Sequence, residues 1–87
     1  INLAEKLDQA AAAALHSELR SQLGQPVRLD GRDVRGVGGL AAQILLAAVR
    51  RWRADGHPLE IHPSDPMVSD LQRLGLDQEI LTQDPVS

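Results

Sequence analysis

Apolar residues in the first part of the chain recur at the three- and four-residue spacing of an amphipathic helix. This helical stripe consists of Ala11 or Ala12, followed by Leu15, Leu19 and Leu23. We expect the helix to begin after Asp8, whose carboxylate can accept the free N–H groups of a first turn. Gly24 is the expected end, since glycine is favoured just beyond the last helical residue. Residues 1–3 alternate apolar, polar and apolar, and indicate a remnant of a strand.

Two strands and a second helix follow. Val27 and Leu29 alternate with Arg28, which predicts a strand over residues 25–30 with one buried face. Residues 34–38 read as an irregular, glycine-rich passage. From about residue 39 to residue 54 the apolar positions cover a wide arc, which predicts a well-buried helix. A short strand is expected over residues 58–61.

The last third of the chain carries strong helix signals. Asp65 is the expected N-cap of a third helix, with Pro66 at the first helical position, where a missing N–H costs nothing. Gly75 should end that helix, and Leu76 can fold back on its last turn. One more turn is expected around Ile80.

Helices and strands therefore alternate along the chain, which favours an α/β fold. We predict a small open sheet of about four strands, mixed or parallel, with the helices packed mainly on one face. Right-handed crossovers would place successive helices on that face. With 87 residues, the chain has room for a single domain over residues 1–87.

Composition narrows the class of protein. The chain has no cysteine, which excludes disulfides and thiolate metal sites. Its net charge is −3 and Trp52 is its only aromatic residue, which argues against nucleic-acid binding. The basic run at residues 50–53 is interpreted as the solvated face of a helix. No apolar run is long enough to span a bilayer and no signal peptide is visible, so we expect a cytoplasmic protein without membrane insertion.

The candidate catalytic and metal-binding groups do not converge. His57 and His62 flank one predicted strand, with Asp55 and Glu60 nearby, but alternate strand positions point to opposite faces. Ser64 is best explained as a cap or turn residue. We therefore expect no metal, no cofactor and no enzymatic activity.

The glycines of residues 36–39 stand directly before the second helix. They lack the ending of a phosphate-binding loop, so they either expose N–H groups to an anion or permit a tight turn. Asp8 and Asp30 both fall at element ends, and in a parallel sheet they would lie at the same edge as Gly38. Two aspartates that cap or turn the chain are an equally good interpretation.

The order of these motifs resembles the STAS family, the anti-sigma factor antagonist-like domains. That family has a Leu-Asp before its first helix, a Leu-Asp strand end, and a Val-x-x-Φ-Asp-Ser-Ser-Gly-Leu loop before the next helix. The corresponding segments here are Leu7-Asp8, Leu29-Asp30, Val34 to Ala42, and Leu74-Gly75-Leu76. Gly56 follows Gly38 by eighteen residues, which matches the family's helix-closing glycine. The resemblance covers nearly the whole chain, although the usual N-terminal strand pair looks clipped.

One departure from the family pattern matters most. The resemblance aligns the family's loop Asp with Gly38 and its two hydroxyl residues with Gly39 and Leu40. The second hydroxyl is the phosphoacceptor of the anti-sigma factor antagonists, and leucine has no oxygen to phosphorylate. No serine or threonine occurs between Ser21 and Ser64, so another register does not restore one.

The resemblance implies a protein-interaction module in bacterial signal transduction or regulation of transcription, with an anti-sigma-type or chemotaxis kinase as partner. An accessory subunit of a lipid-asymmetry ABC transporter, or a small-ligand or nucleotide sensor, are alternatives. A homodimer is also compatible with this reading. The expected partner-binding residues lie at the loop and on the helix after it, and they are Asp8, Asp30, Arg35, Gly36, Gly38, Gly39, Leu40 and Gln43.

Overall fold

The computed structural model describes residues 1–81 as an α/β domain of alternating short strands and helices. In chain order the elements are β1 (Lys6–Leu7), α1 (Gln9–Ser21), β2 (Val27–Gly31), β3 (Gly36–Val37), α2 (Gly39–Asp55), β4 (Leu59–Pro63), α3 (Asp65–Arg73) and α4 (Asp77–Leu81). The predicted α/β class is therefore confirmed.

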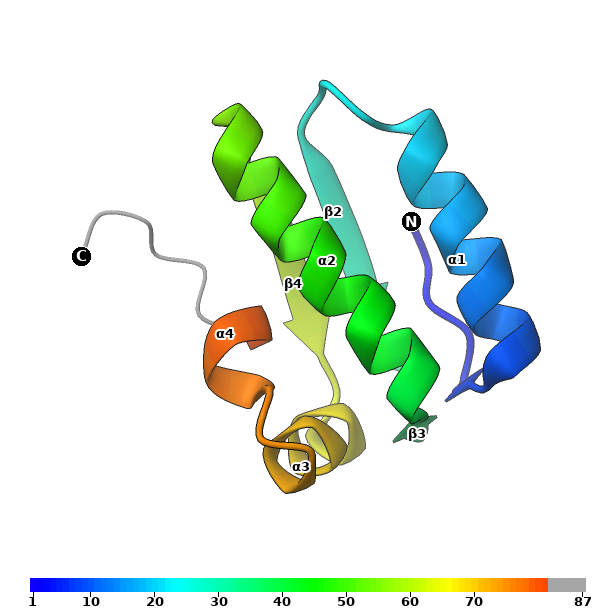
Figure 1. Cartoon of the computed structure of the whole chain (residues 1–87). Helices are drawn as coiled ribbons and strands as arrows, with labels where there is room; N and C mark the ends of the chain where they lie inside the picture. Colours follow the sequence, from blue (N-terminus) through cyan, green and yellow to red (C-terminus); the bar gives the residue numbers. More distant parts are fainter. Residues whose placement is uncertain (82–87) are drawn as a thin grey trace.

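Helices α1 and α2 lie side by side and cover β2 and β4 (Figure 1). Their apolar stripes form much of the core, because Leu15 and Leu19 of α1 and Leu45 and Trp52 of α2 are all buried. The indole Nε1 of Trp52 donates a hydrogen bond of 2.7 Å to the carbonyl oxygen of Gln25. That bond satisfies the one polar atom of a side chain that is otherwise buried among apolar groups.

The strands form two separate parallel ladders. In the first, β2 pairs with β4, with Leu29 opposite Ile61. Residues 1–3 extend this ladder, since the N–H of Asp30 donates to the Ile1 carbonyl (2.8 Å) and the N–H of Leu3 donates to the Asp30 carbonyl (2.9 Å). The strand remnant predicted at residues 1–3 is thus confirmed. The strand predicted at residues 58–61 lies one to two residues later in the structure.

The second ladder, β1 with β3, is the main difference from the prediction. Residues 34–38 were expected to be irregular, but Gly36 and Val37 pair in parallel with Lys6 and Leu7. The predicted four strands and their parallel pairing are confirmed, but within the described residues they form two two-stranded ladders and not one continuous sheet. Strands β1 and β3 contain only two residues each, too few for the sequence pattern to show.

Glycines and a serine define the helix ends. Gly56 and Gly75 both have positive φ values, of 75°, which side-chain-bearing residues rarely adopt. After each glycine the next N–H returns to the helix, and Leu76 donates to the Leu71 carbonyl at 2.9 Å as expected for a fold-back cap. At the start of α3 the prediction was wrong by one residue. Ser64 is the N-cap and Asp65 the first helical residue, because the Ser64 hydroxyl accepts the Met67 N–H.

The basic run at the end of α2 lies on the helix surface, and its charges are engaged within the protein. Arg50 donates to Glu79 of α4 at 2.6 Å, and Arg51 donates to Asp55 one turn further on at 2.9 Å. These exposed pairs contribute little to the free energy of unfolding. The Arg50 pair does connect α2 to α4, the last described helix.

The Arg50–Glu79 pair predicts a pH effect of defined sign. The hydrogen bond from Arg50 lowers the pKa of the Glu79 carboxyl below its usual range. Its stabilising contribution is therefore present above the unfolded-state pKa and is lost as the pH falls through the folded-state pKa. In Arg50→Gln we expect the Glu79 pKa to return upward, measured by NMR titration of the side-chain carboxyl carbon. An unchanged pKa in Arg50→Gln would show that the pair does not form in solution.

Candidate protein-interaction surface

The turn that starts α2 is built around a close backbone approach. Gly38 is the N-cap of α2, and its N–H donates to the Leu7 carbonyl at 2.9 Å. A Cβ atom at Gly38 would lie 3.1 Å from that same carbonyl oxygen, which is tighter than most real contacts. Glycine at position 38 therefore allows the close backbone approach of this turn. Of the two interpretations of the loop, anion binding or a tight turn, the structure supports the tight turn. No side chain caps the N-terminus of α2.

The next two residues face solvent. Gly39 is exposed, and a Cβ placed on it would meet nothing within 4 Å. Leu40 has 50% of its surface exposed and is among the few large apolar side chains in residues 1–81 left so open. Gln43 is also exposed and lies one turn along from Leu40, so the two share one face of α2. An apolar side chain is therefore presented at the position where the family resemblance implies a hydroxyl.

The opposite flank of the loop carries charge. The Arg35 N–H donates to the Glu5 carbonyl at 2.6 Å, and the two side chains form a loose ion pair at 4.0 Å. Both side chains are largely exposed, so Arg35 remains available to a partner. Gly36 lies within β3, where a Cβ would make an ordinary contact of 3.5 Å with Asp70.

Helix α3 holds the loop in place from the other side. The Asp70 carboxylate accepts the N–H of Val37 at 2.8 Å and also the guanidinium of Arg73 at 2.6 Å. The Ser64 hydroxyl donates to the carbonyl of Val34. The sequence interpretation assigned Ser64 as a cap or turn residue, which is correct, but it missed this second bond and the role of Asp70. Neither has a sequence signal, since the partners are about thirty residues away.

The two candidate aspartates have different positions. Asp8 caps α1, with its Oδ1 accepting the Ala11 N–H at 2.9 Å, and the β1–β3 ladder brings it beside Gly38. Asp30 belongs to the other ladder, and its carboxylate is held by both the N–H and the guanidinium of Arg32. These hydrogen bonds hold the pKa of the Asp30 carboxyl below its usual range. Both side chains thus have structural partners, in agreement with the capping and turn interpretation.

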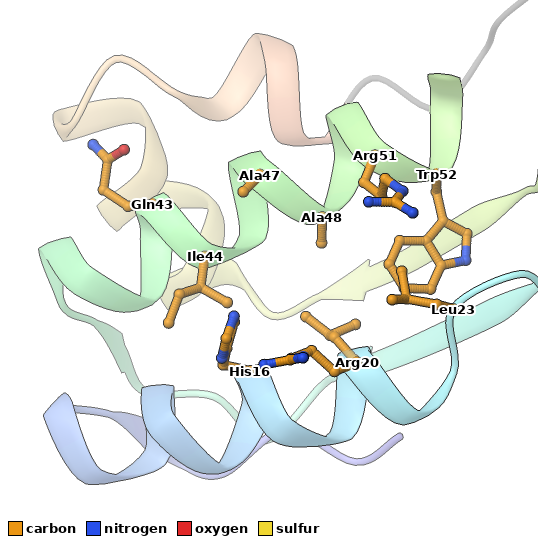
Figure 2. Close-up of a pocket in the computed structure, with 10 residues that line it drawn as sticks. His16, Arg20, Leu23, Gln43, Ile44, Ala47, Ala48, Arg51 and Trp52 are labelled. Carbon is orange, nitrogen blue, oxygen red and sulfur yellow. The ribbon is translucent and has the colours of Figure 1, made fainter. Parts of the chain in front are cut away.

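A groove with a volume of about 490 Å³ lies between α1 and α2 (Figure 2). Its lining includes four apolar or small residues of α2 and one exposed leucine after α1. They are Ile44, Ala47, Ala48, Trp52 and Leu23. Cationic or titratable side chains flank these residues, with His16 and Arg20 on α1 and Arg51 on α2 (Figure 2). Gln43 lies at one end, so the groove begins one turn from Leu40.

Two further properties concern residues 1–81 alone. No set of three or more His, Asp or Glu side chains in this range is arranged so that it could hold a metal ion. None of the helices in this range has the length and apolar character needed to cross a membrane.

The comparison with known families rests on almost the whole chain. Residues 1–83 match a family model described as "Mlab, STAS domain". The chain belongs to the STAS domain family. No curated protein and no solved structure gives a significant match. The family resemblance stated from the sequence motifs is therefore confirmed, and the domain is of a class that includes regulatory and interaction modules.

Within this STAS domain, the loop register can now be placed on the structure. The residues that the resemblance pairs with the family's acid and two hydroxyls, Gly38, Gly39 and Leu40, are the N-cap and the first two helical residues of α2. The side chain aligned with the phosphoacceptor, Leu40, points outward from the first turn, where a phosphate would be accessible if a hydroxyl were present.

Proposed function

We propose that this STAS domain is a non-enzymatic, cytoplasmic protein-interaction module that binds its partner constitutively through the start of α2. The binding surface consists of Arg35, Gly38, Gly39, Leu40 and Gln43. The observation that carries the proposal is Leu40, a half-exposed leucine at the position where the family resemblance implies a phosphorylatable hydroxyl.

The physical argument concerns what phosphorylation does to an interface. A phosphoserine would add about −1.5 to −2 charges to the first turn of α2 and would disrupt an apolar contact. Leucine cannot be modified in this way. Burying the exposed half of its side chain against a partner would contribute roughly 1 kcal/mol. The surface is therefore suited to a contact that is always available, and regulation would have to act elsewhere.

The test uses affinity capture of partners from the native host, followed by measurement of Kd for the purified partner. Leu40→Glu should weaken binding roughly tenfold or more, because it replaces an apolar contact by a charge. The control is Leu74→Glu, which changes a leucine of similar exposure (46%) at the end of α3. Equal effects of the two variants would contradict the proposed surface, as would unchanged binding by Leu40→Glu.

A partner in signalling, either an anti-sigma-type kinase or a chemotaxis kinase, is the first candidate. The family description "Mlab, STAS domain" favours a second candidate, an accessory subunit of a lipid-asymmetry ABC transporter. The captured protein separates the two, since a kinase supports the first and a transporter ATPase or permease supports the second. Both use the same surface, so the Leu40→Glu measurement applies in either case.

A further inference from the structure

We propose that the groove between α1 and α2 is a second docking site, which binds an acidic amphipathic helix of a partner protein. Only Gln43, at one end of the groove, also belongs to the interaction surface described above, so the proposal concerns a second and largely separate site. Three features of the groove support it, namely its length, its openness and its charge.

The length of the groove and the sizes of the side chains that line it fit a short helix. On α2 the lining runs from Gln43 to Trp52, a span of ten residues whose ends lie about 14 Å apart along the helix axis. Between the larger Ile44 and Trp52 side chains, Ala48 points toward α1 and leaves room there because it is small, and Ala47 lies exposed at the edge of the groove (Figure 2). A leucine-sized side chain of a partner helix could insert there, as ridges insert into grooves when helices pack.

The groove is open along its length. Six of its ten lining residues are exposed to solvent, and only Leu19, Ala48 and Trp52 are buried. Sites for small molecules usually enclose most of the ligand surface, which this arrangement does not do. A helix that buries one face and leaves the other in water is the better match, as in helix-in-groove recognition.

The charge around the groove selects an acidic partner. Arg20 of α1 and Arg51 of α2 both line the groove, Arg51 beside Trp52 and Arg20 on the side of His16 (Figure 2), and none of the lining residues is acidic. The chain as a whole has a net charge of −3, so the groove is locally opposite in sign to the protein. Arg51 is engaged with Asp55, whereas Arg20 forms no ion pair within residues 1–81. A carboxylate on the partner helix would give Arg20 a charge-assisted hydrogen bond.

The test is selection from a display library of helical peptides on the intact domain. Apolar residues are fixed in the library at positions i, i+3, i+4 and i+7, and all other positions are randomised. We expect the recovered peptides to be enriched in Asp and Glu. Because Trp52 is the only tryptophan of the chain and lines the groove, its fluorescence reports peptide binding directly.

Matched variants then locate the site. Ala47→Glu, which places a negative charge at the edge of the groove, and Arg20→Glu, which reverses the charge of a lining residue, should each weaken binding of the acidic peptide at least fivefold. The controls are Ala13→Glu, which matches the charge change of Ala47→Glu, and Lys6→Glu, which matches that of Arg20→Glu. Both residues are exposed and lie outside the groove, so neither control should weaken peptide binding. A peptide with lysine in place of its enriched acid should recover affinity for Arg20→Glu. Circular dichroism confirms that each variant is folded.

Several results would overturn the proposal. They are the absence of any binding peptide, the absence of acidic enrichment, and equal loss of affinity in Ala47→Glu and Ala13→Glu. Binding of phosphatidylglycerol vesicles that depends on Arg20, with no peptide bound, would assign the groove to a lipid surface instead. Leu40→Glu should leave peptide affinity in the groove unchanged, so failure of this proposal and failure of the proposed function can be told apart.

Discussion

Leu29→Ala is expected to cause the largest loss of stability among the changes considered for this domain. Leu29 lies at the centre of β2, opposite Ile61 of β4, and none of its surface is exposed. Truncating a fully buried leucine removes its transfer free energy and leaves a cavity, at a cost of about 2–5 kcal/mol. Small domains have a free energy of unfolding of roughly 5–15 kcal/mol, so this is a large fraction of the total.

The measurement is thermal and chemical unfolding followed by circular dichroism. For a domain of this size a loss of 2 kcal/mol corresponds to a fall in Tm of at least about 8 °C. Leu74→Ala removes the same atoms from a position that is 46% exposed, and should change the free energy of unfolding by no more than about 0.5 kcal/mol. Similar losses in the two variants would mean that β2 is not at the centre of the core.

The elements that could be predicted from the sequence are those with a repeating local pattern. Helix α1 follows from leucines at helical spacing, and β2 from the alternation of Val27 and Leu29 about Arg28. These signals are local, because burial of one face requires the apolar residues to recur at the period of the element. The fold-back cap at Gly75 was equally readable, since it depends on the neighbouring residues alone.

The elements that could not be predicted depend on distant partners. Strands β1 and β3 contain two residues each, too few for a period, and they exist only because the chain returns to pair them. The choice of Ser64 over Asp65 as N-cap has a related cause. Both residues can cap a helix, and the hydrogen bond from Ser64 to Val34 is a tertiary contact that adds to its role there.

The candidate interaction surface likewise has one part that a local sequence pattern predicts and another part that depends on distant contacts. The register of Gly38, Gly39 and Leu40 at the start of a helix follows from glycine punctuation before an apolar run, and the structure places α2 there. The contacts that fix the loop, above all Asp70, lie on another helix and give no local signal. Binding of a partner at this surface stays a prediction, for which the exposed Leu40 is the structural support.

Asp70 itself provides the second large prediction. Its Oδ2 accepts the partly buried N–H of Val37 at 2.8 Å, which ties α3 to β3 directly before the turn into α2. Asp70→Ala leaves that donor without a partner, which costs about 1–3 kcal/mol. Alanine is the better helix former, and its propensity offsets at most about 0.7 kcal/mol of that loss. We therefore expect net destabilisation, together with faster hydrogen exchange at the Val37 amide, because its protection depends on this bond.

Two comparisons separate this hydrogen bond from a general effect on α3. Asp70→Asn keeps an oxygen acceptor and should retain much of the stability and of the Val37 protection. Gln72→Ala changes an exposed neighbour on the same helix and should preserve both, since it alters little besides helix propensity. If Val37 exchanged at the same rate in Asp70→Ala as in the unaltered domain, α3 would not be the element that holds the loop.

A loosened loop would also present Leu40 in many orientations, so Asp70→Ala should weaken partner binding although Asp70 is not part of the proposed surface.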